Sequence, residues 1–425
     1  MAEAVLHEPG WLAARRERAA RASGEIELPS FKGRPGWEFT DLGALDLAAY
    51  EPAAGGDPAA ADRAVPVLGH VDAAHVLRQV DAAPLADGGA DGALAAGEPV
   101  VLPLDLAAER LPDVVERHLG SVVPEDDAFV ARNDAGWAGG ALVYVPRGAR
   151  LDGRALLTTV QDAAGAAVFP RTLVVLDEGA EAEVWEQHVS SDGEVDGLFD
   201  AVVEIVVGPN AKLRYVYGQE LSERSWAFAT QRAVVDRDGS LEWVALGFGS
   251  GHGRTRMETQ LRGPGSHARV TGAYAGRGRQ HLDFDTTQEH AAPSTTSDLA
   301  FRGVLADRST AVWRGMIRVD PGAQQTDAFQ ESRNLLLSKR AHADAIPGLE
   351  IEANDVRCTH AAAVAQIDRE QLFYLMSRGL PRETATRLVI DGFLQTLVER
   401  FEEGPLRDAV SAALERRLAA ILDRR

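Results

Sequence analysis

The sequence predicts a mainly β protein, built as a β-helix with helical segments at both ends. Across residues 129–356, turns that carry Gly, Asn or Ser beside a small residue recur, and alternating side chains follow each of them. Strand pairs that repeat at a regular period indicate a solenoid, since each unit buries its inward side chains only against its neighbours. The turn residues lie 31, 31, 29 and 26 residues apart, at Gly148, Gly179, Asn210, Gly239 and Gly265.

Further units of this repeat are expected around Ser309, Gly322 and Arg340, where the spacing is closer. The second interpretation is a two-sheet sandwich. A sandwich would show strands at intervals of roughly 8–12 residues, without a Gly or Asn that recurs at the same position in every turn. We therefore assign residues 111–360 to a β-helix core.

Residues 1–110 are expected to form a helical and α/β cap. Pro9 suits an early helical position, and the helix is predicted to continue to about Ser23. Residues 51–63 are rich in Pro, Gly and Ala, which indicates a loop before short apolar segments. Four arginines of the first helix are interpreted as a solvated face: Arg15, Arg16, Arg18 and Arg21.

Residues 361–425 are predicted to form a helical bundle. Asp368, with Gln371 three residues later, is typical of a capping box at the start of a helix. Gly379 suits the position just after the end of that helix. Two longer helices with apolar stripes are expected to follow. The apolar side chains of the first helix are assigned to the core, among them Phe373 and Leu375.

The composition limits the partners and the compartment. The chain has 44 Lys+Arg against 64 Asp+Glu, a net charge of −20, so it lacks the basic footprint needed for nucleic acid or an anionic membrane. Its single cysteine excludes an internal disulfide and suits a reducing cytosol. No signal-peptide core is present, and no apolar run approaches the length of about 18 residues that indicates a transmembrane helix. We expect a cytoplasmic protein.

Two enzyme classes receive little support. The chain has no phosphate-binding P-loop motif, so we expect that it binds no nucleotide itself. The glycines at 247, 249, 251 and 253 resemble a dinucleotide loop only superficially, because strand-like segments flank them. A carbohydrate-cleaving β-helix could use the carboxylates of Asp283, Asp285 and Glu289, but the chain lacks an export signal.

The segment 347–379 holds the only cysteine, Cys358, with His360 two positions later. If residues 349–356 are the last strand, both side chains share one face at its end. A thiolate and an imidazole make half of a zinc or iron site, which generally needs about four ligands. On spacing alone the structural alternative is favoured, with a small buried thiol and a hydrogen-bonded histidine.

The strings LEIEANDVRCTH and QIDREQLFYLMSRGLP closely resemble the SufB/SufD family of iron–sulfur cluster assembly proteins. Gln330, residues 334–338, residues 281–283 and His290 match the same family pattern. GRPGWEFTDL (residues 33–42) is similar to an element typical of the SufD branch, with Phe39 in place of a tyrosine. The chain departs from the family after the histidine, where AAAVA replaces a glycine-containing segment and so limits φ > 0 conformations.

The resemblance implies a right-handed parallel β-helix in a non-catalytic scaffold subunit. It also implies pairing with a SufB-type paralogue, with a homodimer as the assembly in isolation, and binding of a SufC-type ABC ATPase through the helical C-terminus. An iron–sulfur cluster would be held transiently between the subunits. His360 is the first choice of ligand, since an imidazole is largely neutral at neutral pH, and Cys358 is the second. Ser377 and Arg378 are candidates for the ATPase contact.

Two alternatives remain open on the sequence. One is a SufB-type protein that is itself the main cluster scaffold. The single cysteine and the residues 37–42 favour the SufD branch instead. The other alternative is an unrelated β-solenoid that serves only as an interaction surface.

Overall fold

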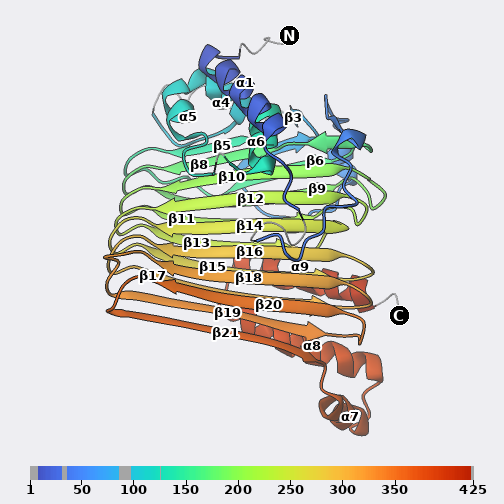
Figure 1. Cartoon of the computed structure of the whole chain (residues 1–425). Helices are drawn as coiled ribbons and strands as arrows, with labels where there is room; N and C mark the ends of the chain where they lie inside the picture. Colours follow the sequence, from blue (N-terminus) through green and yellow to red (C-terminus); the bar gives the residue numbers. More distant parts are fainter. Residues whose placement is uncertain (1–7, 31–35, 86–96, 125, 423–425) are drawn as a thin grey trace.

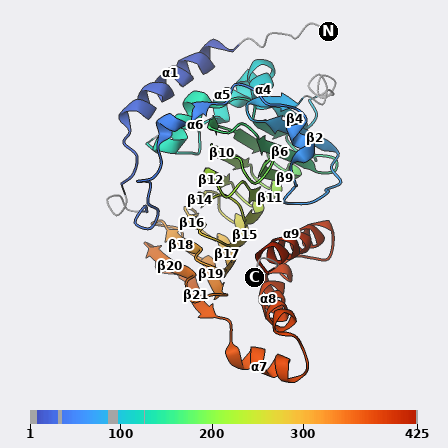
Figure 2. The same cartoon turned by 90° about the vertical axis from the view of Figure 1, so that its right-hand side faces the viewer.

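The computed structural model describes residues 8–30, 36–85, 97–124 and 126–422. Two mainly parallel sheets lie face to face and form a solenoid of about eight turns, which confirms the predicted mainly β, β-helical architecture (Figures 1 and 2). From β8 to β21 the chain crosses to the other sheet after every strand. This alternation distinguishes the fold from the two-sheet sandwich that was the second interpretation.

The first sheet, here sheet A, contains β1 (Glu51–Pro52), β4 (Val100–Pro103), β5 (Ala141–Val145), β7 (Ala166–Val168), β8 (Arg171–Leu176), β10 (Leu198–Val207), β12 (Trp226–Val235), β14 (His252–Leu261), β16 (His281–His290), β18 (Thr310–Val319) and β20 (His342–Ile351). Sheet B contains β2 (His75–Val80), β3 (Ala83–Leu85), β6 (Ala155–Gln161), β9 (Glu181–Ser190), β11 (Lys212–Glu220), β13 (Ser240–Gly247), β15 (His267–Gly276), β17 (Thr296–Leu305), β19 (Thr326–Leu336) and β21 (Val356–Gln366). Strands of successive turns pair in parallel, whereas β2 with β3 and β4 with β5 pair antiparallel.

Helices lie at both ends of the chain. They are α1 (Gly10–Glu25), the 3-10 helix η1 (Leu47–Ala49), α2 (Ala60–Arg63), α4 (Leu104–Arg110), α5 (Pro112–His118), α6 (Ala128–Gly136), α7 (Arg369–Ser377), α8 (Arg382–Val398) and α9 (Pro405–Leu422). Within the described ranges, none of them is long and apolar enough to cross a membrane. Asp368 caps α7 by accepting from the Glu370 N–H at 2.8 Å, and Gly379 follows the helix with φ +93°, as the sequence predicts.

One edge of the solenoid is a ladder of left-handed turn residues. The Gly148 N–H donates to the Glu178 carbonyl at 2.9 Å, and the Gly179 N–H donates to the Pro209 carbonyl at 2.8 Å, so each turn is bonded to the next. These turns require a positive φ, which glycine adopts without steric cost. In successive turns of this ladder, positive φ is found at Gly148, Gly179, Asn210, Asp238, Gly265, Ser294 and Gln325.

Two details of the predicted phasing are wrong. The left-handed residue of the fourth turn is Asp238, with φ 55°, and not the neighbouring Gly239. The predicted closer spacing after Gly265 arises because the marker residues chosen there lie on two different edges of the solenoid. Ser309 and Arg340 follow strands of sheet B, whereas Gly322 follows a strand of sheet A and lies in the same turn as Gln325. The true period therefore does not shorten.

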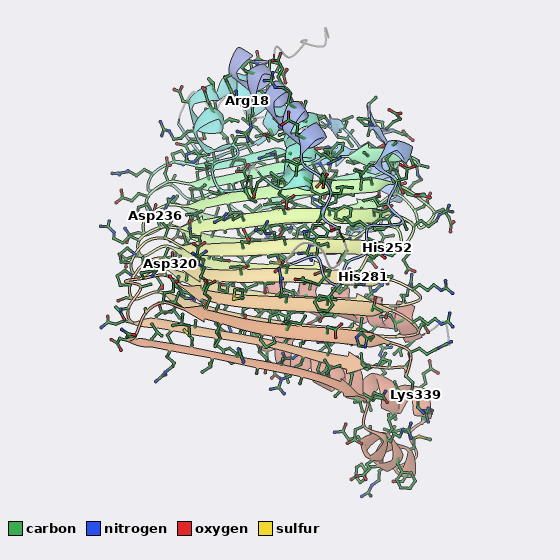
Figure 3. The ribbon with its side chains drawn as sticks, viewed as in Figure 1. Arg18, Asp236, His252, His281, Asp320 and Lys339 are labelled. Atoms are coloured by element: carbon green, nitrogen blue, oxygen red, sulfur yellow. The ribbon has the colours of Figure 1, made fainter. Side chains whose placement is uncertain are left out.

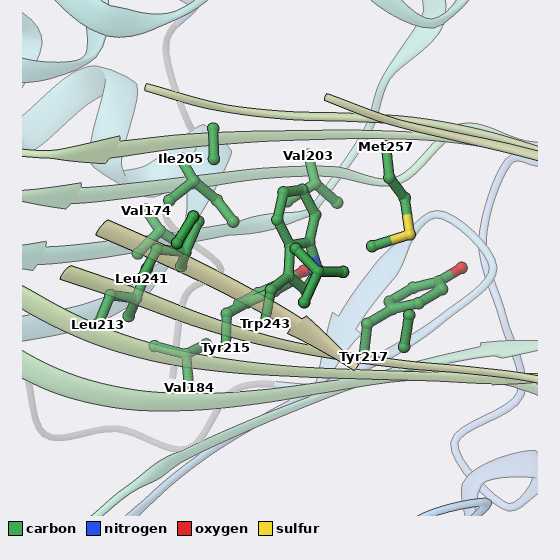
Figure 4. Close-up of a cluster of buried hydrophobic side chains, with 14 of the residues drawn as sticks. Val174, Val184, Val203, Ile205, Leu213, Tyr215, Tyr217, Leu241, Trp243 and Met257 are labelled. Carbon is green, nitrogen blue, oxygen red and sulfur yellow. The ribbon is translucent and has the colours of Figure 1, made fainter. Parts of the chain in front are cut away.

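The main core lies between the two sheets (Figure 4). Trp243 and Tyr215 are fully buried there and meet edge-to-face with ring centroids 5.9 Å apart. A second apolar layer joins the outer face of sheet B to α8 and α9, two helices that Figure 2 shows beside the strands. Removing a buried aromatic side chain from such a core typically costs about 3–5 kcal/mol, so the stacked turns account for much of the stability.

The N-terminal helix is anchored more firmly than the sequence predicts. Arg15 donates to the Asp134 carboxylate and to the Leu119 carbonyl, at 2.8 and 3.0 Å. The Arg16 guanidinium lies 4.3 Å from the centre of the Trp137 ring. The predicted solvated face is therefore wrong for these two arginines, whereas Arg18 and Arg21 are exposed.

Both predicted limits of the repeat also change. Residues around 129 form α6, whose first turn is capped by the Asp127 carboxylate, and the next strand, β5, begins at Ala141. The predicted last strand at 349–356 is in fact the end of β20, a turn, and the first residue of β21. Residues 361–365, where the chain departs from the family pattern, continue β21 as regular strand paired with β19.

The turn ladder predicts a specific cost for adding a Cβ. Gly179→Ala should lower the free energy of unfolding by about 1 kcal/mol, because an L-residue is strained at φ +71° although the site has room for a methyl group. The control is Gly193→Ala, where no positive φ is required and nothing lies within 4 Å. Urea unfolding of the two variants checks the prediction, and equal losses would contradict it.

Candidate functional site

The C-terminal end of the solenoid is open. β20 pairs only with β18, and β21 pairs only with β19, so within the described residues each strand has one edge without a neighbour. Apolar side chains that would be covered by a further turn are exposed there, namely Leu349, Ile351 and Val364. Such an edge is a ready template for pairing with another chain.

Cys358 and His360 lie on β21 at this open end. Their register partners on β19 are Ala328 and Gln330, which are both buried. Residues paired in register project to the same face of a sheet, so both side chains point to the interior side of the solenoid. The predicted shared face is confirmed. The predicted position is not, because the two residues lie inside β21 and not at the end of a strand.

The two candidate ligands differ in their surroundings. Cys358 is half-buried and packs against the small cluster formed by residues such as Ile317, Ala328 and Ala353. Burial, with a contribution from the Asp327 charge, raises the pKa of the Cys358 thiol. A metal must therefore displace a proton from this thiol. His360 is exposed, which suits a ligand that meets a partner at the surface.

Gln330 is the register partner of His360 on the previous turn of the solenoid. Its side-chain amide donates to the Gly315 carbonyl at 3.2 Å and to the Gly348 carbonyl at 3.1 Å, and thereby links β19 to both β18 and β20. A Cβ at Gly315 would lie 2.5 Å from Gln330 Oε1, so glycine is needed for this approach. The sequence offered Gln330 only as a family match, since its role depends on contacts across the two sheets.

The site is incomplete by itself. In the parts of the chain that the structure describes, no group of three or more His, Cys, Asp and Glu side chains is placed to hold a metal ion. Cys358 and His360 can supply two of the roughly four ligands that a cluster or zinc site requires. Further ligands must come from outside this set.

Two other motifs meet on the outer face of sheet A. The Thr40 hydroxyl donates to the Asp283 carboxylate and lies 3.2 Å from His281 Nε2, although Thr40 and His281 are 241 residues apart. The Arg254 guanidinium lies 4.3 Å from the Trp37 ring centre. The segment 36–42 is therefore a strap held on sheet A. Residues 33–35 of the GRPGWEFTDL motif lie outside the described residues.

Three of the dispersed histidines contact neighbouring side chains within the solenoid. His252 stacks on Trp226 with ring centroids 4.3 Å apart, and its neighbour His281 bonds Thr310 through Nδ1 at 2.8 Å (Figure 3). His290 is fully buried and bonds the hydroxyls of Thr295 and Ser297 at 2.8 and 2.9 Å.

The carboxylates considered for glycoside cleavage are held by arginines. Asp283 and Asp285 both pair with Arg254, and Asp285 also pairs with Arg314 at 2.7 Å. Glu289 lies 3.5 Å from Arg232. All three carboxylates are therefore engaged by arginine side chains, whereas glycoside cleavage needs two carboxyl groups that can reach the sugar. The arrangement therefore does not favour this chemistry.

Helix α7 presents apolar side chains to solvent. Phe373 is 74% exposed and Tyr374 is also exposed, so the assignment of Phe373 to the core is wrong. Leu375 is half-buried, and Leu372 fills the core position. Ser377 donates to the Tyr374 carbonyl at 2.7 Å, and the Arg378 guanidinium lies 5.0 Å from the Tyr374 ring centre. Ser377 and Arg378 are thus exposed beside the aromatic pair.

Comparison with known proteins defines the class. The family model described as SUF system FeS cluster assembly, SufBD core domain, matches residues 158–393. The chain therefore belongs to the SufB/SufD family of iron–sulfur cluster assembly proteins, as the resemblance in its sequence indicates.

Within this family the chain is SufD-like. It is 30% identical over 315 residues to the iron–sulfur cluster assembly protein SufD of Bacillus subtilis, a match that covers 73% of this chain and 72% of the relative. SufBD family proteins of Staphylococcus saprophyticus and Staphylococcus aureus are 31% and 30% identical over 308 residues. Those matches cover 72% of this chain and 65% of each staphylococcal protein.

The buried His290 predicts a loss of stability in acid. Burial lowers the pKa of His290 to about 4, whereas an unfolded histidine titrates near 6.5. The unfolded chain therefore takes up this proton first as the pH falls, and stability is lost between about pH 6.5 and pH 4. This residue should contribute a loss of about 2 kcal/mol between pH 7 and pH 5.

The measurement is urea unfolding at both pH values for the wild type and His290→Asn. The variant lacks the titrating group, so its stability should fall less between pH 7 and pH 5. His342→Asn is the control, because the His342 side chain is largely exposed. If wild type and His290→Asn lose the same free energy, His290 does not govern this dependence.

Proposed function

We propose that this chain is a non-catalytic SufD-type subunit of a cytoplasmic iron–sulfur cluster assembly complex. The observation that carries the proposal is the open solenoid end, where an unpaired strand edge and two candidate ligands occur together. The cluster is the cargo of the complex. Membership of the SufB/SufD family supports this role.

The open end supports pairing with a SufB-type paralogue. A second solenoid with an equivalent edge could continue sheet B beyond β21 through main-chain hydrogen bonds. β21 contains no proline, so no backbone donor is missing from its row, whereas Pro347 removes one donor from β20. Pairing would also cover Leu349, Ile351 and Val364, which the single chain leaves exposed. A second copy could occupy the same edge when the paralogue is absent.

The ligand set favours a shared cluster. His360 offers an accessible imidazole, and Cys358 offers the only thiol of the chain. A SufB-type partner across the edge would supply the remaining ligands. The alternative, that this chain is itself the main scaffold, requires more ligands than the described residues provide.

The C-terminal helices support binding of a SufC-type ABC ATPase. α7 extends beyond the end of the sheets (Figures 1 and 2), and it presents Phe373 and Tyr374. Exposed aromatic residues with a neighbouring arginine are typical anchors of protein interfaces. Since this chain has no P-loop motif, ATP hydrolysis would belong to the partner.

The first test of this proposal is His360→Ala in the co-expressed complex. The substitution should change the stability of this exposed site by no more than about 0.5 kcal/mol, but loss of a ligand should lower cluster content by roughly tenfold or more. His75→Ala, a histidine on β2 at the other end of sheet B, is the control. Cluster absorbance is measured per complex after subunit content is shown to be equal.

Cys358→Ser refines this experiment. A loss comparable to that of His360→Ala identifies the thiolate as a ligand, whereas a small loss identifies Cys358 as a packing residue. Equal absorbance and equal transfer of clusters to an acceptor in the wild type and His360→Ala would reduce His360 to a surface residue.

The second test concerns α7. The double substitution of Phe373→Ala and Tyr374→Ala should weaken binding of a SufC-type ATPase at least tenfold, because truncation of an aromatic anchor typically costs about 2 kcal/mol or more. Ser377→Ala and Arg378→Ala should each have a smaller effect. Phe39→Ala, an exposed aromatic on the strap, is the control. Affinity is measured by calorimetry, and unchanged binding by the double variant would place the docking surface elsewhere.

A further inference from the structure

A cavity of about 220 Å³ lies between the strap and the outer face of sheet A. Its walls come from the strap, from α6, and from β12, β14, β16 and β18. The strap is drawn in dark blue across the front of these strands in Figure 1. Gly36 approaches so closely that a Cβ there would lie 2.6 Å from Arg314 Nη2. The cavity is separate from the open end formed by β20 and β21.

One wall of this cavity is aromatic. Trp37 stacks on Phe129 with ring centroids 5.6 Å apart, and Phe129 stacks on Phe228 at 4.0 Å. All three rings are buried in the chain. They form a rigid apolar surface, which suits an aliphatic or other apolar group of a small ligand.

The opposite wall is charged and balanced. It contains three arginines, Arg254, Arg256 and Arg314, and three acidic residues, Asp127, Glu258 and Asp285. Arg256, Asp285 and Arg314 are aligned in register on the neighbouring strands β14, β16 and β18. Arg254 and Arg314 both bond Asp285, at 2.8 and 2.7 Å, and Arg256 bonds Glu258 at 2.8 Å.

Two guanidinium nitrogens of this wall are held only loosely. Arg256 Nη1 lies 3.7 Å from Asp127 Oδ2, and Arg314 Nη1 lies 3.8 Å from Glu38 Oε2, both beyond hydrogen-bond distance. These arginine side chains are 33% and 31% exposed, so both can be reached from solvent. The Asp127 carboxylate uses Oδ1 to cap α6, which leaves Oδ2 as an acceptor.

Charge balance decides which ligand the cavity suits. A simple anion would have to compete with carboxylates that already hold the arginines, and a simple cation would compete with the arginines. A molecule that carries both charges can bond Arg256 or Arg314 with its anionic group and Asp127 with its cationic group, and leaves the net charge of the cavity unchanged. The aromatic wall requires an apolar portion.

We infer that this cavity binds a small zwitterionic α-amino acid with an apolar side chain. The carboxylate is held by Arg256, the ammonium group by Asp127, and the side chain lies against Phe129 and Phe228. This site is independent of the proposed cluster and ATPase contacts.

Calorimetric titration of the full chain with L-valine tests the inference. Isovalerate is valine without the ammonium group, and isobutylamine is valine without the carboxylate, so each should bind at least about tenfold more weakly, as expected for one lost charged hydrogen bond. Inorganic phosphate serves as the simple anion. Equal binding of isovalerate or phosphate would show an anion site and overturn the zwitterion assignment, and no binding of valine at millimolar concentration would overturn the site itself.

Two variants locate the binding. Arg256→Gln should weaken valine binding at least about tenfold by removing a charged donor. Asp127→Asn should have a similar effect while preserving the cap of α6, because asparagine is an equivalent N-cap residue. Arg262→Gln, which alters an exposed arginine outside the cavity, is the control and should bind valine as the wild type does. Valine binding that is unchanged in Asp127→Asn, with an unchanged melting temperature, would contradict the assignment.

Discussion

The structure depends on the stacking of equivalent residues from one turn of the solenoid to the next. Parallel pairing in register places each inward side chain directly on that of the previous turn. One interior column of sheet B runs through Tyr215, Trp243, Val270, Leu299, Gln330 and His360. His360 is thus the last member of a core column. It is exposed only because no described strand continues the sheet.

Polar groups enter the interior where partners are available. Glu186 accepts hydrogen bonds from the Thr172 hydroxyl at 2.8 Å and from the Tyr215 hydroxyl, and lies 2.9 Å from His188 Nε2. Gln330 bonds two carbonyls of sheet A. A buried polar group without a partner destabilises the fold. These networks therefore favour one alignment of the two sheets, and they also contribute to stability.

The sequence predicts the features that depend on local order. The period of the turns follows from residues such as Gly148 and Gly179, and the shared face of Cys358 and His360 requires only the alternation of a strand. The sequence does not identify Asp238 as the left-handed residue of its turn. Aspartate and glycine both adopt a positive φ, so residue type does not distinguish Asp238 from the neighbouring Gly239.

Other features depend on segments that are distant in the chain. The roles of Arg15 and Thr40 follow from Asp134 and His281, which no periodicity connects to them. The exposure of Phe373 was missed for a related reason. An apolar stripe on a helix indicates that this face packs against other apolar side chains. It does not show whether those side chains belong to the same chain or to another protein.

The two ends of the solenoid differ in a way that limits the size of any assembly. At the N-terminal end, within the described ranges, the last strand of sheet B is the short β3 and the last strand of sheet A is the short β4, which contain Pro84 and Pro103. Proline and short length both discourage further strand addition. A molecule with one blocked end and one receptive end can join a single partner head to head, but it cannot add copies indefinitely. For the pair proposed above, this asymmetry would close the assembly at two chains and prevent growth into filaments.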